Sequence, residues 1–149
     1  MMGKKYVLVK EDSKGWLGRT LFRVKALVDG KFFKKGELGG YIEKEDNLSQ
    51  DGNAWVYGNA WVYGNAWVYG DARVYGDARV YGNARVYGNA WVSGDAWVYG
   101  DARVYGNAWV SGKVKIDFIL CSKFNFEFQW QLKEWQKLEK QFERIEKNR

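Results

Sequence analysis

The centre of the chain repeats one six-residue unit: glycine, asparagine or aspartate, alanine, tryptophan or arginine, valine, and tyrosine or serine. Ten copies follow one another over residues 52–111 without a single insertion. Self-similarity at a short fixed period indicates an architecture of stacked units, each of which buries its apolar side against its neighbours. This repeat therefore limits the possible folds more than any other feature of the sequence.

The spacing inside the unit predicts a short strand followed by a corner. Alanine and valine are two residues apart, so both point to one side of a strand, and the other two side chains point to the opposite side. Glycine with asparagine or aspartate suits a tight corner, because these residues tolerate left-handed backbone. An eleventh unit, 112–117, keeps only the apolar positions. We expect a solenoid whose interior is filled by alanine and valine.

The order of tryptophan and arginine indicates how many units make one turn. Three units with tryptophan are followed by three with arginine, and tryptophan then returns. A turn of eighteen residues would stack equivalent side chains in outer columns and place arginines over tryptophan rings. The repeats are so alike that a slip of one unit would leave the interior unchanged. The predicted columns are Trp55, Arg73, Trp91 and Trp109; Trp61, Arg79 and Trp97; and Trp67, Arg85 and Arg103.

Tyrosine gives way to serine at only two positions, Ser93 and Ser111, which are eighteen residues apart and so share a column. Beside Trp91 and Trp109, they predict a shallow apolar notch that a helix or a partner side chain could enter. We interpret the outer columns and both serines as a binding surface, because large exposed aromatic areas are typical of contact surfaces. Two alternatives stay open: the ladders only stiffen short strands, and the serines reflect neutral drift.

The last segment differs from the repeats. Residues 124–130 alternate as a strand does, and residues 131–147 have apolar side chains on one face of an amphipathic helix. Large rings do not fit an interior sized for alanine and valine, so we expect this segment to leave the coil and cover its open end or a side face. Alternatively, the helices of two chains pair along a short seam. The predicted capping or oligomerisation residues are Phe124, Phe126, Phe128, Trp130, Trp135, Leu138, Phe142 and Ile145.

The chain contains no histidine. This absence excludes Ser-His-Asp and Cys-His catalysis and metal sites with histidine ligands. The one cysteine, Cys121, has no partner for an internal disulfide, and we interpret it as a small buried apolar residue. We therefore predict no catalytic residues, no metal site and no cofactor.

The net charge of +6 is carried outside the repeats, because residues 52–112 hold four basic and four acidic side chains. A phosphate-binding surface would have to come from the two ends, so nucleic acid is a poor partner for the columns. No apolar stretch has transmembrane length, and the charged N-terminal residues do not fit a signal peptide. We expect one cytoplasmic domain without a membrane partner.

Two stretches resemble known proteins. The "VYGNAW" pattern, an aliphatic residue with a small one four places later, resembles the hexapeptide-repeat left-handed β-helix family over residues 52–117. The run "LGGYIEKEDNLSQDGNAWVY", Leu38 to Tyr57, resembles YdcK-like proteins, which are assigned to the transferases, and hexapeptide-repeat proteins of phages and prophages. In such proteins this run leads into the first coil, where Ile42 and Leu48 would be the first inward residues.

The resemblance implies a mostly-β fold: a left-handed parallel β-helix of about four triangular coils. An N-terminal β-rich cap would precede it and a C-terminal amphipathic α-helix would follow. The corresponding regions are 1–41 for the cap, 42–117 for the β-helix, and 118–149 for the strand and helix that cap or oligomerise.

The resemblance does not settle the function, because one fold supports many functions. Acyltransferases of this family use a histidine base, which this chain lacks, and we interpret its corner aspartates as solvated and compensated by arginines. We predict a non-enzymatic binding or scaffold protein whose partners are itself, as a dimer or trimer, and an unidentified protein. If it is phage-encoded, it would act in the host-cell cytoplasm as an inhibitor of a host complex. The alternatives are a degenerate acyltransferase, a glycan-binding module and a single-stranded nucleic-acid-binding module. The corner aspartates are Asp71, Asp77, Asp95 and Asp101.

Overall fold

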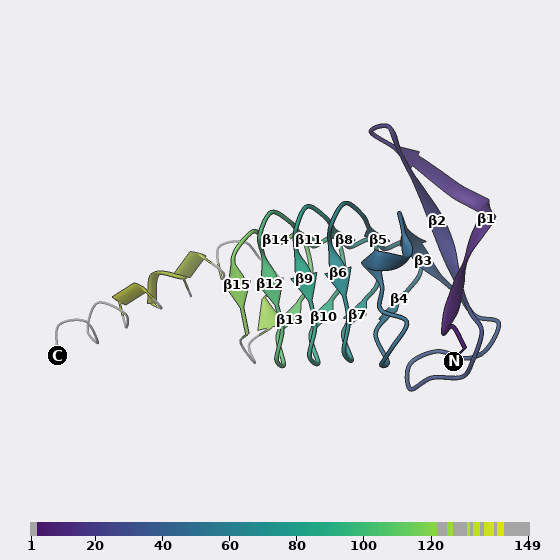
Figure 1. The fold of residues 1–149 in the computed structure, drawn as a ribbon. Coiled ribbons are helices and arrows are strands. Elements are labelled where there is room, and N and C mark those ends of the chain that lie inside the picture. Colours follow the sequence, from purple (N-terminus) through teal and green to yellow (C-terminus); the bar gives the residue numbers. More distant parts are fainter. Residues whose placement is uncertain are drawn as a thin grey trace.

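A computed structural model describes residues 3–121, 125, 126, 131, 133, 134, 136–138, 140 and 141. Within these residues, the strands form three sheets that are the three sides of a parallel β-solenoid of about four turns (Figure 1). The five-stranded face consists of β4 (Trp55–Val56), β7 (Arg73–Val74), β10 (Trp91–Val92), β13 (Trp109–Val110) and β16 (Asn125–Phe126). The four-stranded face consists of β6 (Trp67–Val68), β9 (Arg85–Val86), β12 (Arg103–Val104) and β15 (Ile119–Leu120).

The third side, the seven-stranded face, includes the N-terminal cap. Its strands are β1 (Tyr6–Trp16), β2 (Arg19–Ala26), β3 (Leu38–Ile42), β5 (Trp61–Val62), β8 (Arg79–Val80), β11 (Trp97–Val98) and β14 (Lys115–Ile116). The first pairs, β1–β2 and β2–β3, are antiparallel, and β3 then pairs in parallel with β5. The cap is therefore continuous with one side of the solenoid, as Figure 1 shows at the N-terminal end.

The strand register confirms the predicted turn of eighteen residues. Trp55 pairs with Arg73, Arg73 with Trp91, and Trp91 with Trp109. The other two predicted columns are also in register. The left-handed winding implied by the resemblance stays a prediction.

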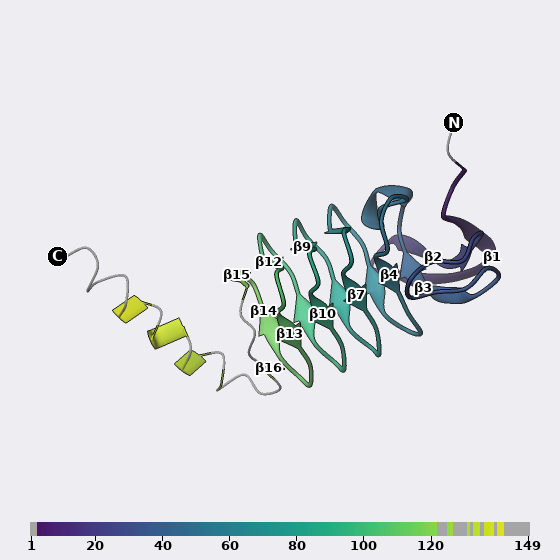
Figure 2. The ribbon, with the colours of Figure 1, turned by 90° about the horizontal axis from the view of Figure 1, so that it is seen from below.

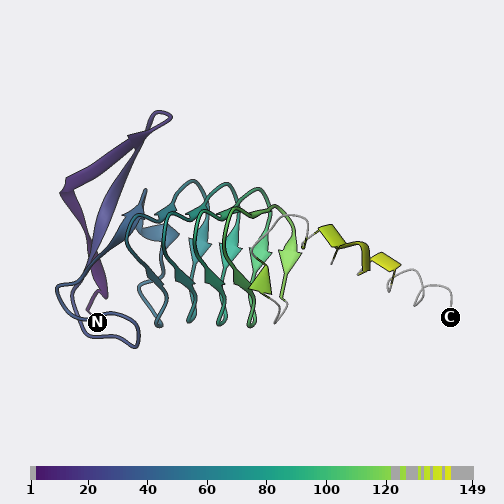
Figure 3. The same cartoon turned by 180° about the vertical axis from the view of Figure 1, so that it is seen from behind.

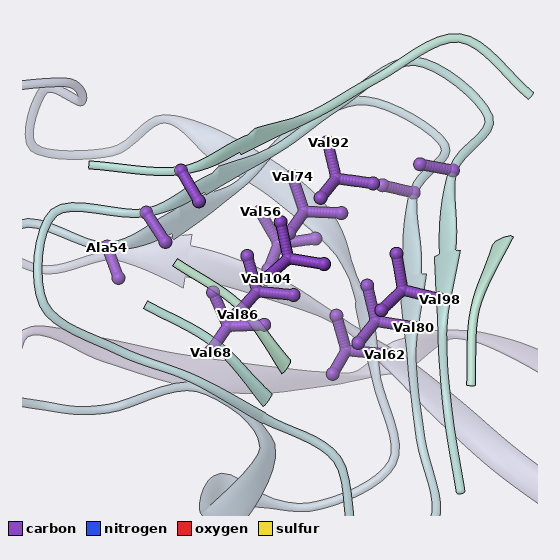
Figure 4. Close-up of a cluster of buried hydrophobic side chains, with 14 of the residues drawn as sticks. Ala54, Val56, Val62, Val68, Val74, Val80, Val86, Val92, Val98 and Val104 are labelled. Atoms are coloured by element: carbon purple, nitrogen blue, oxygen red, sulfur yellow. The ribbon is translucent and has the colours of Figure 1, made fainter. Parts of the chain in front are cut away.

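The interior consists of the alanine and valine columns. These residues are buried throughout the repeats, and Figure 4 shows valines from all three faces converging on the axis. In the described repeats, only the glycines have positive φ; at Gly76 φ is 72°. The corner asparagines instead bond along the axis, as Asn53 does when its amide donates to a carboxylate oxygen of Asp71 at 3.0 Å. Figure 2 shows the stacked corners from below.

The cap joins the first coil as the sequence predicted. Ile42 pairs with Val62, Leu48 forms a bridge with Val68, and both Ile42 and Leu48 are fully buried. They flank the short 3₁₀ helix η1 (Glu45–Asn47). The predicted first inward residues are therefore confirmed.

Polar groups fasten the cap to the solenoid. The buried ammonium of Lys5 donates to the carbonyl oxygen of Ala54 at 2.8 Å, and burial lowers the pKa of Lys5 to about 8. The hydroxyl of Tyr6 donates to the carbonyl oxygen of Leu48, and burial raises the pKa of Tyr6. The side chain of Gln50 accepts from the backbone N–H groups of Lys5 and Tyr6 and donates to the carbonyl of Tyr6.

Parallel pairing continues beyond residue 117, where we predicted the solenoid to end. Strand β15 pairs with β12, and β16 pairs with β13. The last turn is shorter, because Arg103 pairs with Ile119, sixteen positions later. The prediction that residues 124–130 leave the coil is wrong for the backbone of residues 125 and 126. Main-chain groups of β13 need partners whatever the size of the neighbouring side chains.

The predicted C-terminal helix falls mostly on residues outside the described ones. Residues 131, 133, 134, 136–138, 140 and 141 have α-helical backbone, shown in yellow in Figure 3. Leu138 is one of them, and its side chain is 55% exposed. Whether this segment caps its own coil or pairs between chains stays a prediction. No helix among the described residues has the length and apolarity needed to cross a membrane. The side chain of Phe126 also lies outside what the structure describes, as do six whole residues among the predicted capping residues: Phe124, Phe128, Trp130, Trp135, Phe142 and Ile145.

Candidate binding surface

The outer columns bring arginines onto tryptophan rings, as the sequence predicted. The guanidinium carbon of Arg79 lies 4.4 Å from the ring centre of Trp61 and 5.5 Å from that of Trp97. On the four-stranded face, Arg85 lies 5.8 Å from the ring centre of Trp67. Each such contact stabilises an exposed site by roughly 0.5–1 kcal/mol. The columns are therefore ordered by contacts between side chains as well as by the strands beneath them.

Tyrosines form a second set of columns beside the first. The rings of Tyr69 and Tyr87 are 4.8 Å apart with an interplanar angle of 5°, and Tyr87 and Tyr105 repeat this geometry at 4.9 Å and 3°. Stacked rings cover one another's faces and leave their edges and hydroxyl groups outward. Nucleobases and sugars bind aromatic side chains mainly through ring faces, so this arrangement disfavours both classes of ligand on the column of Tyr69, Tyr87 and Tyr105. On the five-stranded face, by contrast, Tyr57 and Tyr75 meet edge-on at 84°.

The cap covers the start of two faces. Trp55, which we predicted to be part of the exposed surface, is fully buried because Phe33 stacks on it at 4.5 Å and Tyr6 contacts its edge. Trp16 of the cap lies 4.8 Å from the guanidinium of Arg79. The cap residues Trp16 and Phe33 were missed by the sequence reasoning, since no repeat relates them to a column.

The four-stranded face is the most open of the three. Trp67 is 39% exposed, Arg85 and Arg103 are exposed, and Ile119 is 56% exposed. Ile119 was not predicted to join this column, because only the shortened last turn places it next to Arg103. The same register places Cys121 beside Tyr105, and the thiol is exposed rather than buried as we predicted. A hydrogen bond with Cys121 raises the pKa of Tyr105.

The five-stranded face carries two shallow depressions, but neither is lined by the two serines. Ser93 is buried, and its hydroxyl lies 3.4 Å from the carbonyl oxygen of Val110, so it cannot form the floor of an open notch. Ser111 is half-buried. The two depressions meet at Arg73. One, of about 380 Å³, is lined by Tyr57, Arg73, Tyr75 and Trp91, and the other, of about 360 Å³, by Lys31, Phe32, Arg73, Asn89, Trp91, Asn107, Ala108 and Trp109.

The repeat arginines are not compensated by aspartates in the way we predicted. Among the described repeat residues, no ion pair joins an aspartate to an arginine. The observed pairs lie within the cap, between the cap and Glu43 or Glu45, or in the C-terminal segment. In the cap, Asp12 accepts from Arg23 at 2.6 Å and from the hydroxyl of Tyr41, and these bonds lower the pKa of Asp12. The reason is geometric: the aspartates occupy corners, whereas the arginines extend over rings in the strands.

Stacked six-residue units, each with a short strand and with inward alanine and valine, define this chain as a β-solenoid repeat protein. A family model, the YdcK β-solenoid repeat, matches residues 54–70, 66–82, 72–86, 78–94 and 96–112. The matches lie inside the solenoid, so the repeats of this chain are similar to those of YdcK. No curated protein sequence matches the chain.

Proposed function

We propose that this chain is a non-enzymatic binding or scaffold protein that holds a partner protein on the outer columns of its solenoid. The observation that carries this proposal is the open four-stranded face, where two exposed arginines lie between exposed Trp67 and Ile119. Exposed apolar and aromatic groups combined with arginine are typical of protein contact surfaces. A β-solenoid also holds such groups in a fixed array, so little entropy is lost on binding.

The absence of histidine favours binding over the acyltransferase alternative. A carboxylate base would have to replace the imidazole, and the corner residues Asp77, Asp95 and Asp101 are exposed. Asp77 and Asp95 line one open surface depression and Asp101 lines another, and both depressions are mostly polar. General bases in enzymes act in sites that withdraw the substrate from water, which these exposed carboxylates do not provide. The transferase assignment of YdcK-like proteins is therefore not part of our proposal.

The test is capture of a partner by the intact chain and by a variant of the open face. Arg85→Glu with Arg103→Glu reverses two charges on this face, and Lys25→Glu with Lys34→Glu makes the same charge change on exposed cap lysines as a control. We expect one protein to co-purify with the intact chain and the control but not with the face variant. A partner retained equally by all three would contradict a role for this face. If the chain is phage-encoded, we propose that this partner is a component of a host complex that the chain inhibits.

We further propose that the chain is a dimer or trimer assembled through its C-terminal segment. Light scattering behind size exclusion, on the intact chain and on a chain ending at Ser122, tests this. We expect a discrete oligomer for the intact chain and a monomer or aggregate for the shorter one. A monomeric intact chain of 17.3 kDa would refute this assembly and leave the face as the sole contact.

A further inference from the structure

Arg73 is held between two aromatic rings from distant parts of the sequence. Its guanidinium carbon lies 3.5 Å from the ring centre of Phe32 in the cap and 4.2 Å from that of Trp91 in the next coil. The hydroxyl of Tyr57 donates to the carbonyl oxygen of Phe32 at 2.7 Å and so fixes the cap loop on this face. The arginine is therefore positioned before any ligand binds.

The charge of Arg73 has no anionic partner among the described residues. No carboxylate forms an ion pair with it, and its Nε–H is buried without a hydrogen-bond acceptor. Arg23, in contrast, is paired with Asp12 and also donates to the carbonyl oxygen of Gly39. A partly desolvated guanidinium that lacks an acceptor gains most from an added anion, because charge-assisted hydrogen bonds strengthen as water is excluded.

The surroundings of Arg73 select the rest of the ligand. On one side, the depression is walled by the rings of Tyr57, Tyr75 and Trp91 and is mostly apolar. On the other side, Lys31 and the amides of Asn89 and Asn107 lie beside Trp109. A ligand that fits both sides has an anion at Arg73 and a flat apolar group next to it.

We propose that this site, the Arg73 clamp, binds a carboxylate adjacent to an aromatic side chain, supplied by an acidic, aromatic segment of the partner protein. This inference rests on the proposed binding function and names the chemistry of the partner. Guanidinium groups pair with carboxylates through two parallel N–H bonds; since the Nε–H of Arg73 is buried, these bonds would come from its two terminal amino groups. The neighbouring rings accept an aromatic group edge-on or stacked. A nucleic-acid strand fits less well, because the faces of Phe32 and Trp91 that contact Arg73 are already occupied and the repeats carry no net charge.

The test uses N-acetyl-L-phenylalaninate as a minimal probe on the full chain, followed through the indole N–H resonances. We expect a saturable shift at Trp91, with affinity weaker by about tenfold or more for N-acetylphenylalaninamide, which lacks the charge, and for acetate, which lacks the ring. Arg73→Gln should abolish the shift, and Arg73→Lys should weaken it while keeping the charge. Lys25→Gln, which removes an exposed cation of the cap that lines neither depression, should leave it unchanged.

Three results would overturn the inference. If N-acetylphenylalaninamide binds as tightly as N-acetyl-L-phenylalaninate, the site is a purely apolar groove, and if inorganic phosphate does so, it is a general anion site. The third result is an unchanged resonance shift in Arg73→Gln. Thermal unfolding shows whether each variant is folded. If Arg73→Gln does not fold, the weaker probe binding expected for Arg73→Lys becomes the test. The two proposals fail separately. A partner lost from the Arg85→Glu/Arg103→Glu variant but retained by Arg73→Gln refutes the clamp alone, and probe binding without any captured partner refutes the proposed function alone.

Discussion

Replacing one corner glycine tests how closely successive coils approach. Gly76 has a φ of 72°, and a Cβ added there would lie 2.9 Å from the backbone nitrogen of Gly94 in the next coil. Gly58 is one coil below with a φ of 56°, but a Cβ there would lie 3.9 Å from its nearest neighbour, the carbonyl oxygen of Gly76. Both positions require left-handed backbone, and only Gly76 lacks space for a methyl group.

Gly58→Ala should therefore cost only the left-handed conformation, about 1–2 kcal/mol. Gly76→Ala adds a contact with backbone that cannot rotate away, and overpacking of this kind costs about 1–3 kcal/mol more. For a chain of this length, each kcal/mol lowers Tm by about 2–4 °C. Urea and thermal unfolding, followed by circular dichroism, give both differences in free energy.

The difference between the two variants is the informative quantity. Equal destabilisation by Gly58→Ala and Gly76→Ala would show that the coils separate at no cost, and the argument from coil spacing would be refuted. A larger loss at Gly76 would show that the stacking distance is set by main-chain bonds such as the one from Asp77 N–H to the carbonyl oxygen of Gly94 at 2.8 Å. An unchanged chain in both cases would contradict the left-handed conformation itself.

Three further predictions concern the cap and the columns. Trp55→Ala should lower the free energy of unfolding by about 3–5 kcal/mol because the ring is fully buried, whereas Trp109→Ala, at a ring 41% exposed, should cost less than half as much in the same urea titration. Because burial lowers the pKa of Lys5 from 10.5 to about 8, the unfolded chain holds a proton that the folded chain lacks between these values, so stability should rise by about 1 kcal/mol per pH unit above pH 8. Lys5→Met should remove this rise of stability with pH. Above pH 10 a second group lowers the stability, because burial raises the pKa of Tyr57 to about 12 and folded Tyr57 keeps a proton that the unfolded chain loses. Arg79→Ala should cost about 1–3 kcal/mol, because it loses ring contacts with Trp16, Trp61 and Trp97, and a neutral result would show that these contacts contribute nothing.

The sequence by itself determined the solenoid and the order of its columns. Identical units impose identical local conformations, so the inward positions of alanine and valine, the eighteen-residue turn and the contact of Arg79 with Trp61 follow from periodicity. Ile42 and Leu48 were also predictable, because they keep the six-residue spacing of the inward positions.

Only the tertiary structure decided which parts of that surface are covered and which are free. The cap has no repeat, so its sequence does not indicate which column Phe32, Phe33 or Trp16 contacts. The paths of the β1–β2 hairpin and of the loop between β2 and β3 determine these contacts. The same paths bury Trp55 and complete the Arg73 clamp. The shortened last turn likewise places Ile119 beside Arg103 and Cys121 beside Tyr105, because losing two residues at one corner shifts the pairing by two positions; side chains alternate with a period of two, so both stay outward. Periodic contacts are local in origin and can be predicted from sequence, whereas contacts between a repeat and a non-repeating segment depend on the three-dimensional path of the chain.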